Sequence, residues 1–336
     1  MPASNFTRRR LLKQTFAFSA AMTLGSRKRL IGANEVNSAD HHLMMFGDWG
    51  AVEKEMKPQE AVAKGMKRYV RNAKIKPGAM LLLGDNFYGA FKGGTSCPRW
   101  KTQFEDMYPA RVFPGPCYVT LGNHDYDDEP KDKLIAELDY PKDRPGTRWT
   151  MPAKWYAFEF PRQNPLIKFI VLDSNYKNRL VSLTAAEKAS QNAWFKTEIA
   201  KPRTTPWLIV MAHHPLYSNG MHGDNQALIA DWEPLFKEHK VDFYFSGHDH
   251  DMQHMEFEKH PTSFVISGGG GARVRVGEGA EAAGGTLKHG PFLKTVYGFS
   301  HLEINKDRII TRHLDANRKQ IHAFSKTTTG KVEILG

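Results

Sequence analysis

The stretch GDNFYG occupies residues 84–89 and directly follows the apolar run Ala79–Leu83. An apolar run of this length, bounded by a glycine, is typical of a buried strand. A plain turn would be enough to end such a strand. Here the strand is followed by the carboxylate of Asp85, the amide of Asn86 and then the phenol of Tyr88. A strand end that carries both a carboxylate and a phenol predicts a binding site rather than a simple connection.

The same pattern, an apolar run that ends in polar residues, recurs along the chain. The other runs are LMMFGDWG (43–50), CYVTLGNHD (117–125), KFIVLDSN (168–175), WLIVMAHHP (207–215) and DFYFSGHDH (242–250). Continuous apolar runs predict strands that are covered on both faces. Helical patterns lie between them, at Pro58–Asn72, Leu183–Ala200 and Asn225–Lys240. Alternating strands and helices favour an α/β sheet with ligand groups at the carboxyl ends of its strands.

The chain changes character after Gly247. Four β-type segments follow one another without helices: SFVISGGGG (263–271), YGFSHLEIN (297–305), RIITRHLD (308–315) and QIHAFSK (320–326). We expect them to form an antiparallel meander. The glycine-rich segment Gly268–Gly285 lacks the Lys-Ser/Thr of a phosphate-binding P-loop, so it is expected to be a surface loop.

The amino-terminal residues 1–33 predict an export signal. TRRRLLK at Thr7–Lys13 precedes the moderately apolar stretch Gln14–Gly25 and resembles a twin-arginine signal. Ala33 and Ala39 are both candidate ends of the signal. This predicts a protein that is periplasmic or extracellular. The alternatives are a disordered basic tail and, less favoured, a membrane anchor formed by an uncleaved signal.

The charge of the chain is concentrated in this segment. Residues 1–33 hold seven Lys or Arg and no acid, so removing them lowers the net charge from +11 to +4. A mildly basic domain does not indicate nucleic-acid binding and suits a small anionic substrate. No apolar run approaches the ~18 residues of a membrane helix, so stable membrane insertion is not expected. The two cysteines, Cys97 and Cys117, leave open whether they form a disulfide.

Several polar residues stand in order at the ends of the apolar runs. They are Asp48, Asp85, Tyr88, Asn123, His124, His213, His248 and His250. Neighbouring strands lie ~4.8 Å apart, so side chains at adjacent strand ends can converge. Carboxylate, amide, phenol and imidazole groups form a mixed oxygen and nitrogen set that suits iron, zinc or manganese. So many ligands predict two ions ~3.5–4 Å apart with one shared carboxylate, a geometry used for phosphoryl displacement.

The motifs GDWG, GDNFY, GNHD, AHHP and GHDH resemble the five signatures of the calcineurin-like metallophosphoesterases. The tyrosine of GDNFY is similar to that of the purple acid phosphatases. FEDMY, GHDHDMQHM and SFVISGGG resemble segments of the small, mammalian tartrate-resistant type. The resemblance spans residues 43–315. It implies a four-layer α/β/β/α sandwich with mixed central sheets, formed by one catalytic domain at 40–330.

The resemblance also implies the role of each site residue. The ferric site would use Asp48, Asp85, Tyr88 and His250. The divalent site, for Fe, Zn or Mn, would use Asp85 again with Asn123, His213 and His248. His124 and His222 match histidines that contact the substrate, whereas His214 is expected to pack nearby.

This reading predicts an exported acid phosphatase that hydrolyses phosphate monoesters by attack of a metal-bound hydroxide. Its partner would be a small phosphorylated substrate, and the sequence leaves the natural substrate and the oligomeric state open. Two alternatives remain at this stage. One is a phosphodiesterase or nucleotidase of the same fold with Zn or Mn, and the other is an exported, non-catalytic binder of phosphate ligands.

Overall fold

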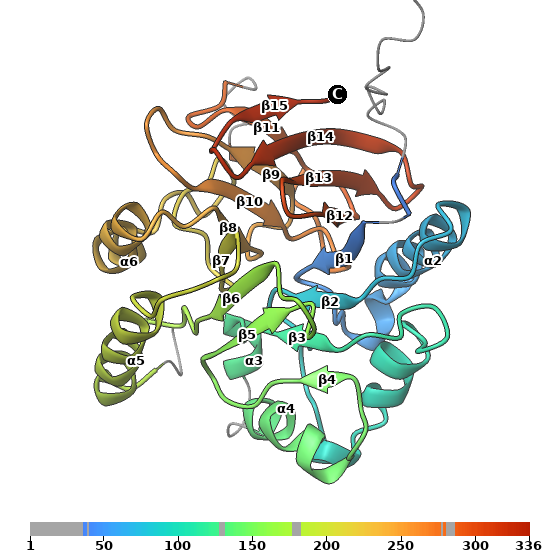
Figure 1. Cartoon of the computed structure of the whole chain (residues 1–336). Coiled ribbons are helices and arrows are strands. Elements are labelled where there is room, and N and C mark those ends of the chain that lie inside the picture. Colours follow the sequence, from blue (N-terminus) through green and yellow to red (C-terminus); the bar gives the residue numbers. More distant parts are fainter. Residues whose placement is uncertain (1–35, 39, 128–131, 177–182, 277, 280–285) are drawn as a thin grey trace, which may run out of the picture. The chain divides into compact units, whose positions relative to one another are not determined.

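The computed structural model describes residues 36–38, 40–127, 132–176, 183–276, 278–279 and 286–336. Val36–Gly336 forms one compact unit (Figure 1). The predicted export signal at 1–33 lies outside the described residues, as do its candidate ends Ala33 and Ala39. Among the helices of the described part, none combines the length and the apolarity that a membrane-spanning segment needs.

The first of two mixed sheets has eight strands in the order β15-β14-β13-β12-β1-β2-β3-β4. They are β1 (His41–Phe46), β2 (Ala79–Leu82), β3 (Cys117–Val119), β4 (Trp149–Thr150), β12 (Gly298–Ile304), β13 (Arg308–Asp315), β14 (Gln320–Thr327) and β15 (Val332–Ile334). Strands β1 to β4 pair in parallel, and β12 to β15 pair antiparallel. The carboxyl ends of β1, β2 and β3 therefore lie at one edge.

The second sheet has seven strands in the order β11-β9-β10-β8-β7-β6-β5. They are β5 (Tyr156–Phe160), β6 (Ile167–Val171), β7 (Trp207–Met211), β8 (Phe243–Ser246), β9 (Met252–Met255), β10 (Ser263–Ser267) and β11 (Pro291–Lys294). Strands β6, β7, β8 and β10 are parallel. Strands β5, β9 and β11 pair antiparallel with their neighbours.

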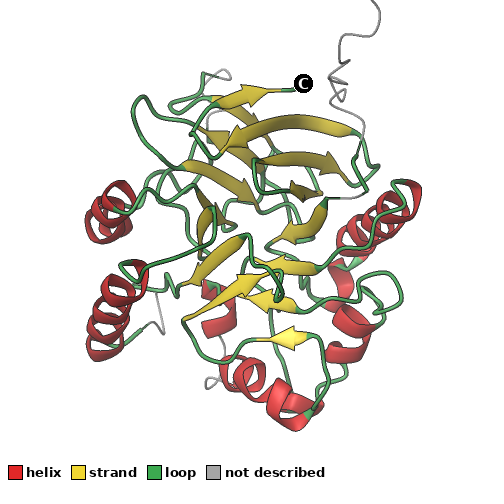
Figure 2. Cartoon of the chain, in the orientation of Figure 1, coloured by secondary structure: helices red, strands yellow, loops and turns green. Residues whose placement is uncertain are grey.

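The two sheets pack against each other between outer helical layers (Figures 1 and 2). Strand β7 shows why, since its side chains alternate between two cores. Ile209 and Met211 belong to the core between the sheets, and Leu208 and Val210 belong to the core under helices α5 and α6. This arrangement confirms the predicted four-layer α/β/β/α sandwich.

The predicted helices form close to their expected bounds, as α2 (Lys57–Asn72), α5 (Ala185–Ile199) and α6 (Gln226–Glu238). Helix α5 begins with a capping box, in which Thr184 Oγ1 accepts from the Glu187 amide and Glu187 Oε2 accepts from the Thr184 amide. Shorter helical segments were not predicted. They are α3 (Asn123–Tyr126), α4 (Asp132–Asp143), η1 (Glu53–Glu55), η2 (Gly94–Ser96) and the π-helical η3 (Trp100–Glu105).

The prediction of one carboxyl-terminal meander is wrong for its first segment. Strand β10 pairs with β8 and β9 in the seven-stranded sheet, and only β12, β13 and β14 form the expected meander. The apolar pattern identifies a buried strand but does not encode its partner. The missed strand β9, directly after the GHDH motif, turns the chain back so that β10 joins β8.

The prediction of a surface loop at Gly268–Gly285 is also wrong for its first residues. Gly268–Ala272 are buried, because the backbone here packs against the strand ends of the other sheet. A Cβ atom at Gly270 would lie 2.3 Å from the carbonyl oxygen of Gly47, so only glycine fits. Cys97 and Cys117 are buried free thiols, which answers the open disulfide question in the negative.

Candidate active site

Seven predicted ligand residues converge at one edge of the sandwich, where strands of both sheets end. Asp48 follows β1, Asp85 and Tyr88 follow β2, and Asn123 follows β3. From the other sheet, His213 follows β7, and His248 and His250 follow β8. Within the second set, the amide of Gly247 donates to the His213 carbonyl. The amide of His248 joins the two sets, because it donates to Asp48 Oδ2 at 2.9 Å.

The phenol of Tyr88 lies at the centre of the first group of side chains. Its hydroxyl oxygen is 2.9 Å from Asp85 Oδ2, 3.3 Å from Asp48 Oδ1 and 3.2 Å from His250 Nε2. His250 donates from Nδ1 to the Arg273 carbonyl at 2.7 Å, which turns Nε2 toward the carboxylates. The other three residues predicted for this ion therefore all lie close to the Tyr88 hydroxyl, which gives the tyrosine after β2 a place in the site.

The second group forms around His213. Its Nε2 lies 3.4 Å from Asp85 Oδ1 and 3.2 Å from Asn123 Oδ1. Its Nδ1 donates to the carbonyl of Leu83 at 2.8 Å, so Nε2 again faces the site. The His248 ring is centred 5.1 Å from that of His213. Asp85 thus contacts members of both groups, which is the position that a bridging carboxylate requires.

The backbone at the strand ends is held in a conformation that is uncommon outside glycine. Asp48, Asp85 and His248 have φ angles of 58°, 49° and 71°. Each such residue costs of order 1–3 kcal/mol and persists only where the surrounding structure enforces it. Space for these turns is provided by glycine, since a Cβ at Gly122 would lie 2.2 Å from Asp85 Oδ1.

The electrostatics show that this cluster suits a cation. Burial raises the pKa of Asp48 well above its usual range. Burial is the largest influence on Asp85 and acts in the same direction, but the charge and hydrogen bond of His213, together with the charge and amide of His124, outweigh it and hold the Asp85 pKa well below its usual range. For Tyr88, burial and then the negative charges of Asp85 and Asp48 raise the pKa well above 10. These oxygens can all be deprotonated together only beside a strong positive charge, so the donor set fits a metal centre.

His214 lies closer to the site than the sequence predicted. One ring nitrogen of His214 lies with one each of His213 and His248 in a group whose ligand atoms are all within 4.8 Å of one another. Asp48, Asp85 and His213 form a second such group. Nδ1 of His214 is 2.8 Å from the hydroxyl oxygen of Ser174, which fixes the ring beside the centre.

Three buried supports of the site, Asp125, Arg99 and Asp249, were not predicted from the sequence. Asp125 Oδ1 accepts from the amides of Asn86 and Phe87 at 2.8 and 3.2 Å, and the other carboxylate oxygen accepts from the Gly122 amide. The position of Asp125 in the GNHD motif was the available signal. The side-chain amide of Asn86 accepts from Trp49 Nε1 at 3.1 Å and donates to Asp125, so it ties together the loops after β1, β2 and β3.

Arg99 is the second missed support. Its guanidinium donates to the carbonyls of Tyr88, Ala90, Gly50 and Ala51 at 2.8–3.1 Å. It thereby joins the GDWG loop to the GDNFY loop and sets the position of Tyr88. Nothing in the sequence around Arg99 indicates this role, because all of these acceptors are backbone atoms.

The two predicted catalytic histidines lie on opposite flanks of the centre. His124 donates from its backbone amide to Asp85 Oδ1 at 2.8 Å, and its ring lies 4.4 Å from that of Tyr88. The His222 ring lies 4.1 Å from that of His248. His222 Nδ1 is 2.7 Å from Asp249 Oδ1, a buried carboxylate whose role the GHDH motif did not reveal.

Comparison with known proteins agrees with this geometry. The family described as calcineurin-like phosphoesterase matches residues 39–252. The chain belongs to the calcineurin-like phosphoesterases. Purple acid phosphatase 17 of Arabidopsis thaliana is 30% identical over 245 residues, covering 68% of this chain and 67% of that protein. Tartrate-resistant acid phosphatase type 5 of Mus musculus is 26% identical over 297 residues, covering 83% and 88%.

A solved structure extends the comparison of the fold. GAP50, described as the anchor in the inner membrane complex of Plasmodium, matches this phosphoesterase with a TM-score of 0.69 and 24% identity. The match covers 84% of this chain and 87% of that chain. Membership of the family implies hydrolase activity and a binuclear metal centre, and the relatives confirm the predicted resemblance to purple and tartrate-resistant acid phosphatases.

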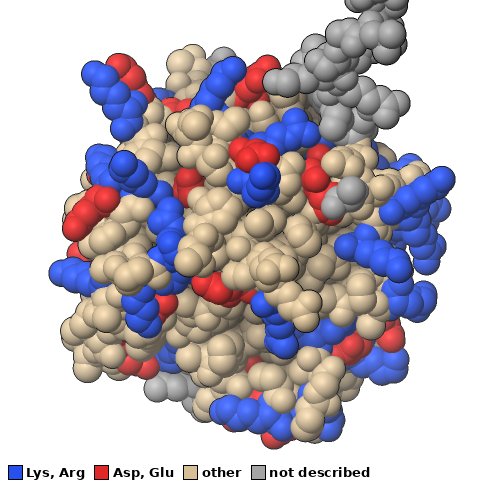
Figure 3. Space-filling view, viewed as in Figure 1, with Lys and Arg blue, Asp and Glu red and all other residues tan. Residues whose placement is uncertain are grey.

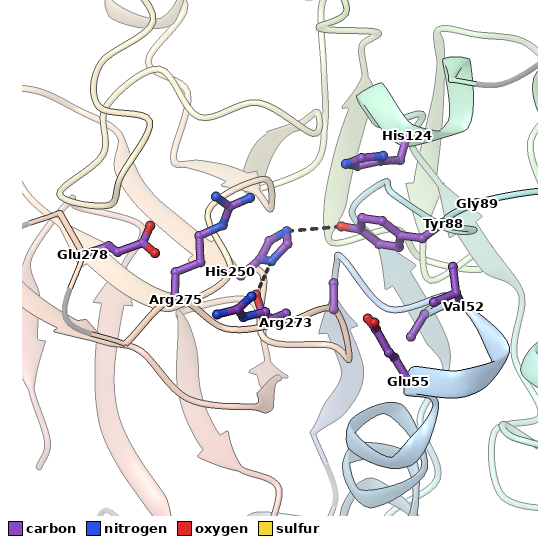
Figure 4. A pocket seen from close by; sticks show the side chains of 11 residues that line it. Val52, Glu55, Tyr88, Gly89, His124, His250, Arg273, Arg275 and Glu278 are labelled. Atoms are coloured by element: carbon purple, nitrogen blue, oxygen red, sulfur yellow. Dashed lines mark hydrogen bonds between the residues drawn. The ribbon is translucent and has the colours of Figure 1, made fainter.

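Two cavities flank the centre of this phosphoesterase. The first has a volume of about 450 Å³ and is lined by Tyr88, His124 and His250 on the side of the first ligand group. Figure 4 shows Arg275 and Glu278 on its opposite wall. The second has a volume of about 440 Å³, and its lining residues are Asn123, His214, Pro215, His222, Gly223, Asp224, Asn225, Gln226 and His248. The two candidate catalytic histidines therefore line different cavities.

Proposed function

We propose that this phosphoesterase is an exported acid phosphatase that hydrolyses small phosphate monoesters. The observation that carries the proposal is the contact of the Tyr88 phenol with both Asp48 and Asp85. Burial and the two adjacent carboxylates oppose ionisation of this phenol. A strongly charged cation bound beside it would reverse that effect, so the position suits a phenolate ligand.

The proposed ligand assignment follows the two groups of side chains. Asp48, Asp85, Tyr88 and His250 hold Fe(III), for which carboxylates and a phenolate are suitably hard anionic donors. Asp85 also joins the second set, in which Asn123, His213 and His248 hold a divalent ion of Fe, Zn or Mn. When bound, the two ions supply a hydroxide nucleophile and neutralise charge on the phosphoryl oxygens.

The residues around the centre position the substrate and move a proton. His222 lines the second cavity, and Asp249 holds its Nδ1, so Nε2 is free to donate a proton to the leaving oxygen. His124 lines the first cavity above Tyr88 and is placed to bind a phosphoryl oxygen.

The proposal also includes the location of the protein and the extent of its catalytic domain. The TRRRLLK motif supports export by the twin-arginine route to the periplasm or the outside of the cell. The catalytic domain is proposed to span residues 40–330. Strand β15 extends the eight-stranded sheet a few residues further, to Ile334.

Two other functions are separable by experiment. A phosphodiesterase or nucleotidase with Zn or Mn in both positions would not need a phenolate ligand, so Tyr88 disfavours it. A non-catalytic binder has one observation in its favour, because a protein of this fold is described as an anchor. The complete donor set argues against it, since a protein that only binds has no need for both ligand groups.

The deciding experiment assays the metal-loaded protein on p-nitrophenyl phosphate and on bis-p-nitrophenyl phosphate, from pH 4 to pH 8. We expect turnover of the monoester with an acid optimum and much slower turnover of the diester. Faster hydrolysis of the diester would support the first alternative. Binding of phosphate without turnover of either ester would support the second.

A further inference from the structure

The segment that contains helix α2 carries more positive charge than the rest of the domain together. Residues 57–76 hold seven Lys or Arg and one acid, Glu60, for a net charge of +6. Residues 34–336 carry +4 in total, so everything else in them sums to −2. The positive character of the domain therefore resides in one helix and the turn that follows it.

Helical geometry places these charges on one face. Successive residues turn by about 100°, so positions three or four apart lie side by side. The stripe is formed by the exposed Lys57, Lys64, Arg68 and Arg71 together with the half-buried Lys67, and among charged residues only Glu60 interrupts it. The opposite face packs into the core through Val62, Ala63, Met66 and Val70. Figure 3 shows the Lys and Arg side chains gathered over α2, on the right of the view.

The cations of the stripe differ from two lysines on the other long helices, which have acidic partners. On the other long helices, Lys188 pairs with Asp231 at 2.9 Å and Lys237 with Glu233 at 2.8 Å. Within the described part of the chain, no side chain of the α2 stripe forms an ion pair or a hydrogen bond. Burial, and then the charges of Arg111 and Arg71, lower the pKa of Lys67. Arg111, from the loop before β3, thus extends the same patch.

The fold itself gives no reason for this stripe. Cations in the last turn of a helix are favoured by its dipole, which accounts for Arg71. It does not account for Lys64 and Lys67 in the middle or for Lys57 in the first turn. Like charges at these spacings destabilise a helix, so the stripe weakens the free protein and would be relieved by a polyanionic partner.

We propose that the basic stripe of α2 adsorbs the protein to an anionic lipid surface. Lipid is favoured over nucleic acid because the exposed residues of α2 include no aromatic side chain on which a base could stack. Among the described residues, the exposed large apolar side chains lie outside α2, so adsorption is electrostatic and sensitive to salt. This inference does not depend on the proposed catalytic function.

The test uses vesicles of phosphatidylcholine with and without phosphatidylglycerol, and measures sedimentation of the full chain at low and high salt. One variant removes four charges of the stripe, as Lys64→Gln, Lys67→Gln, Arg68→Gln and Arg71→Gln. A control variant removes four charges from exposed sites elsewhere, as Lys92→Gln, Lys196→Gln, Lys306→Gln and Lys319→Gln. Both variants keep the cations of residues 1–33 and have the same net charge, and thermal unfolding by circular dichroism checks their folding.

A basic residue near an anionic surface strengthens partitioning roughly fivefold, so four substitutions should weaken it by about 10²–10³-fold. We expect this loss in the stripe variant at low salt and a change of a few-fold in the control. Equal losses in the two variants, or equal binding of the wild type to both vesicle types, would overturn the proposal. Tighter binding to duplex DNA than to the anionic vesicles, lost in the stripe variant, would also overturn it and indicate a nucleic-acid partner.

Discussion

Replacing His222 by alanine tests whether the second cavity contains the proton donor. In the structure, His222 is 2.7 Å from the buried carboxylate of Asp249, and its ring lies 4.1 Å from that of the ligand candidate His248. A positioned general acid contributes roughly 10²–10⁴-fold, and most when the leaving group is a poor one. We expect His222→Ala to lower kcat/KM for an alkyl phosphate by about 10²–10³-fold. p-Nitrophenolate needs little help to leave, so the loss on its ester should be under about tenfold.

A second variant separates proton donation by His222 from the orientation of its ring by Asp249. Asp249 Oδ1 accepts from the His222 ring and backbone, and Oδ2 accepts from the Ser218 hydroxyl. Asp249→Asn keeps the shape of the group but removes its charge. Hydrogen bonds to charged groups exceed neutral ones by about 1–1.5 kcal/mol, which corresponds to roughly five- to tenfold. We therefore expect a loss of that size on the alkyl ester in Asp249→Asn.

The assay is steady-state kinetics on both esters, with metal content measured for each variant. His222 is not a proposed ligand, so its loss should leave the metal content unchanged. Equal losses on the alkyl and aryl esters would mean that His222 positions the substrate rather than donating a proton. No loss on either ester would refute its participation altogether.

Three further results are expected. Asp85→Asn should lose both ions and Asn123→Ala only one, because Asp85 contacts both ligand groups; metal analysis showing two ions in Asp85→Asn would contradict the bridge. Arg99→Met should lower the free energy of unfolding by about 3–5 kcal/mol in denaturant titrations, because it leaves four backbone carbonyls without their buried donor, whereas the exposed control Arg144→Met should have little effect. Burial and the neighbouring His254 lower the pKa of His322 to about 3, below its unfolded value of ~6.5. The unfolded chain then takes up the proton first, so the stabilising contribution is present above pH 6.5 and is lost as the pH falls toward 3. His322→Asn should flatten this acid dependence of unfolding and the exposed His41→Asn should not.

The residues of the centre were predictable because residues with metal-binding side chains directly follow the apolar runs that predict the strands. Asp48, Asp85, Asn123, His213 and His248 each stand just after an apolar run, and parallel strands bring such positions to one edge. The structure places all of them at that edge of the two sheets.

The supports of the centre were less predictable. Arg99 donates hydrogen bonds to backbone carbonyls, and no pattern of side chains in the sequence predicts such contacts. Asp125 and Asp249 stood inside recognised motifs, but their partners only became evident in three dimensions.

The strands after Gly247 show that the sequence pattern predicts where a strand lies but not which strand it pairs with. The apolar pattern of Ser263–Ser267 predicts a buried strand correctly, yet it is equally compatible with either sheet. Its place beside β8 is fixed by the short strand β9 and by the close approach of Gly268–Gly271 to the loop after β1. Long-range contacts of this kind are not encoded in local periodicity.

Metal analysis combined with a visible spectrum tests most directly whether Tyr88 is a ligand of a ferric ion. The protein should be purified after export by its own host. We expect iron in the protein and a tyrosinate-to-Fe(III) charge-transfer band, which Tyr88→Phe should abolish while some iron remains bound. A colourless wild-type protein that is fully active with two zinc ions would contradict the account.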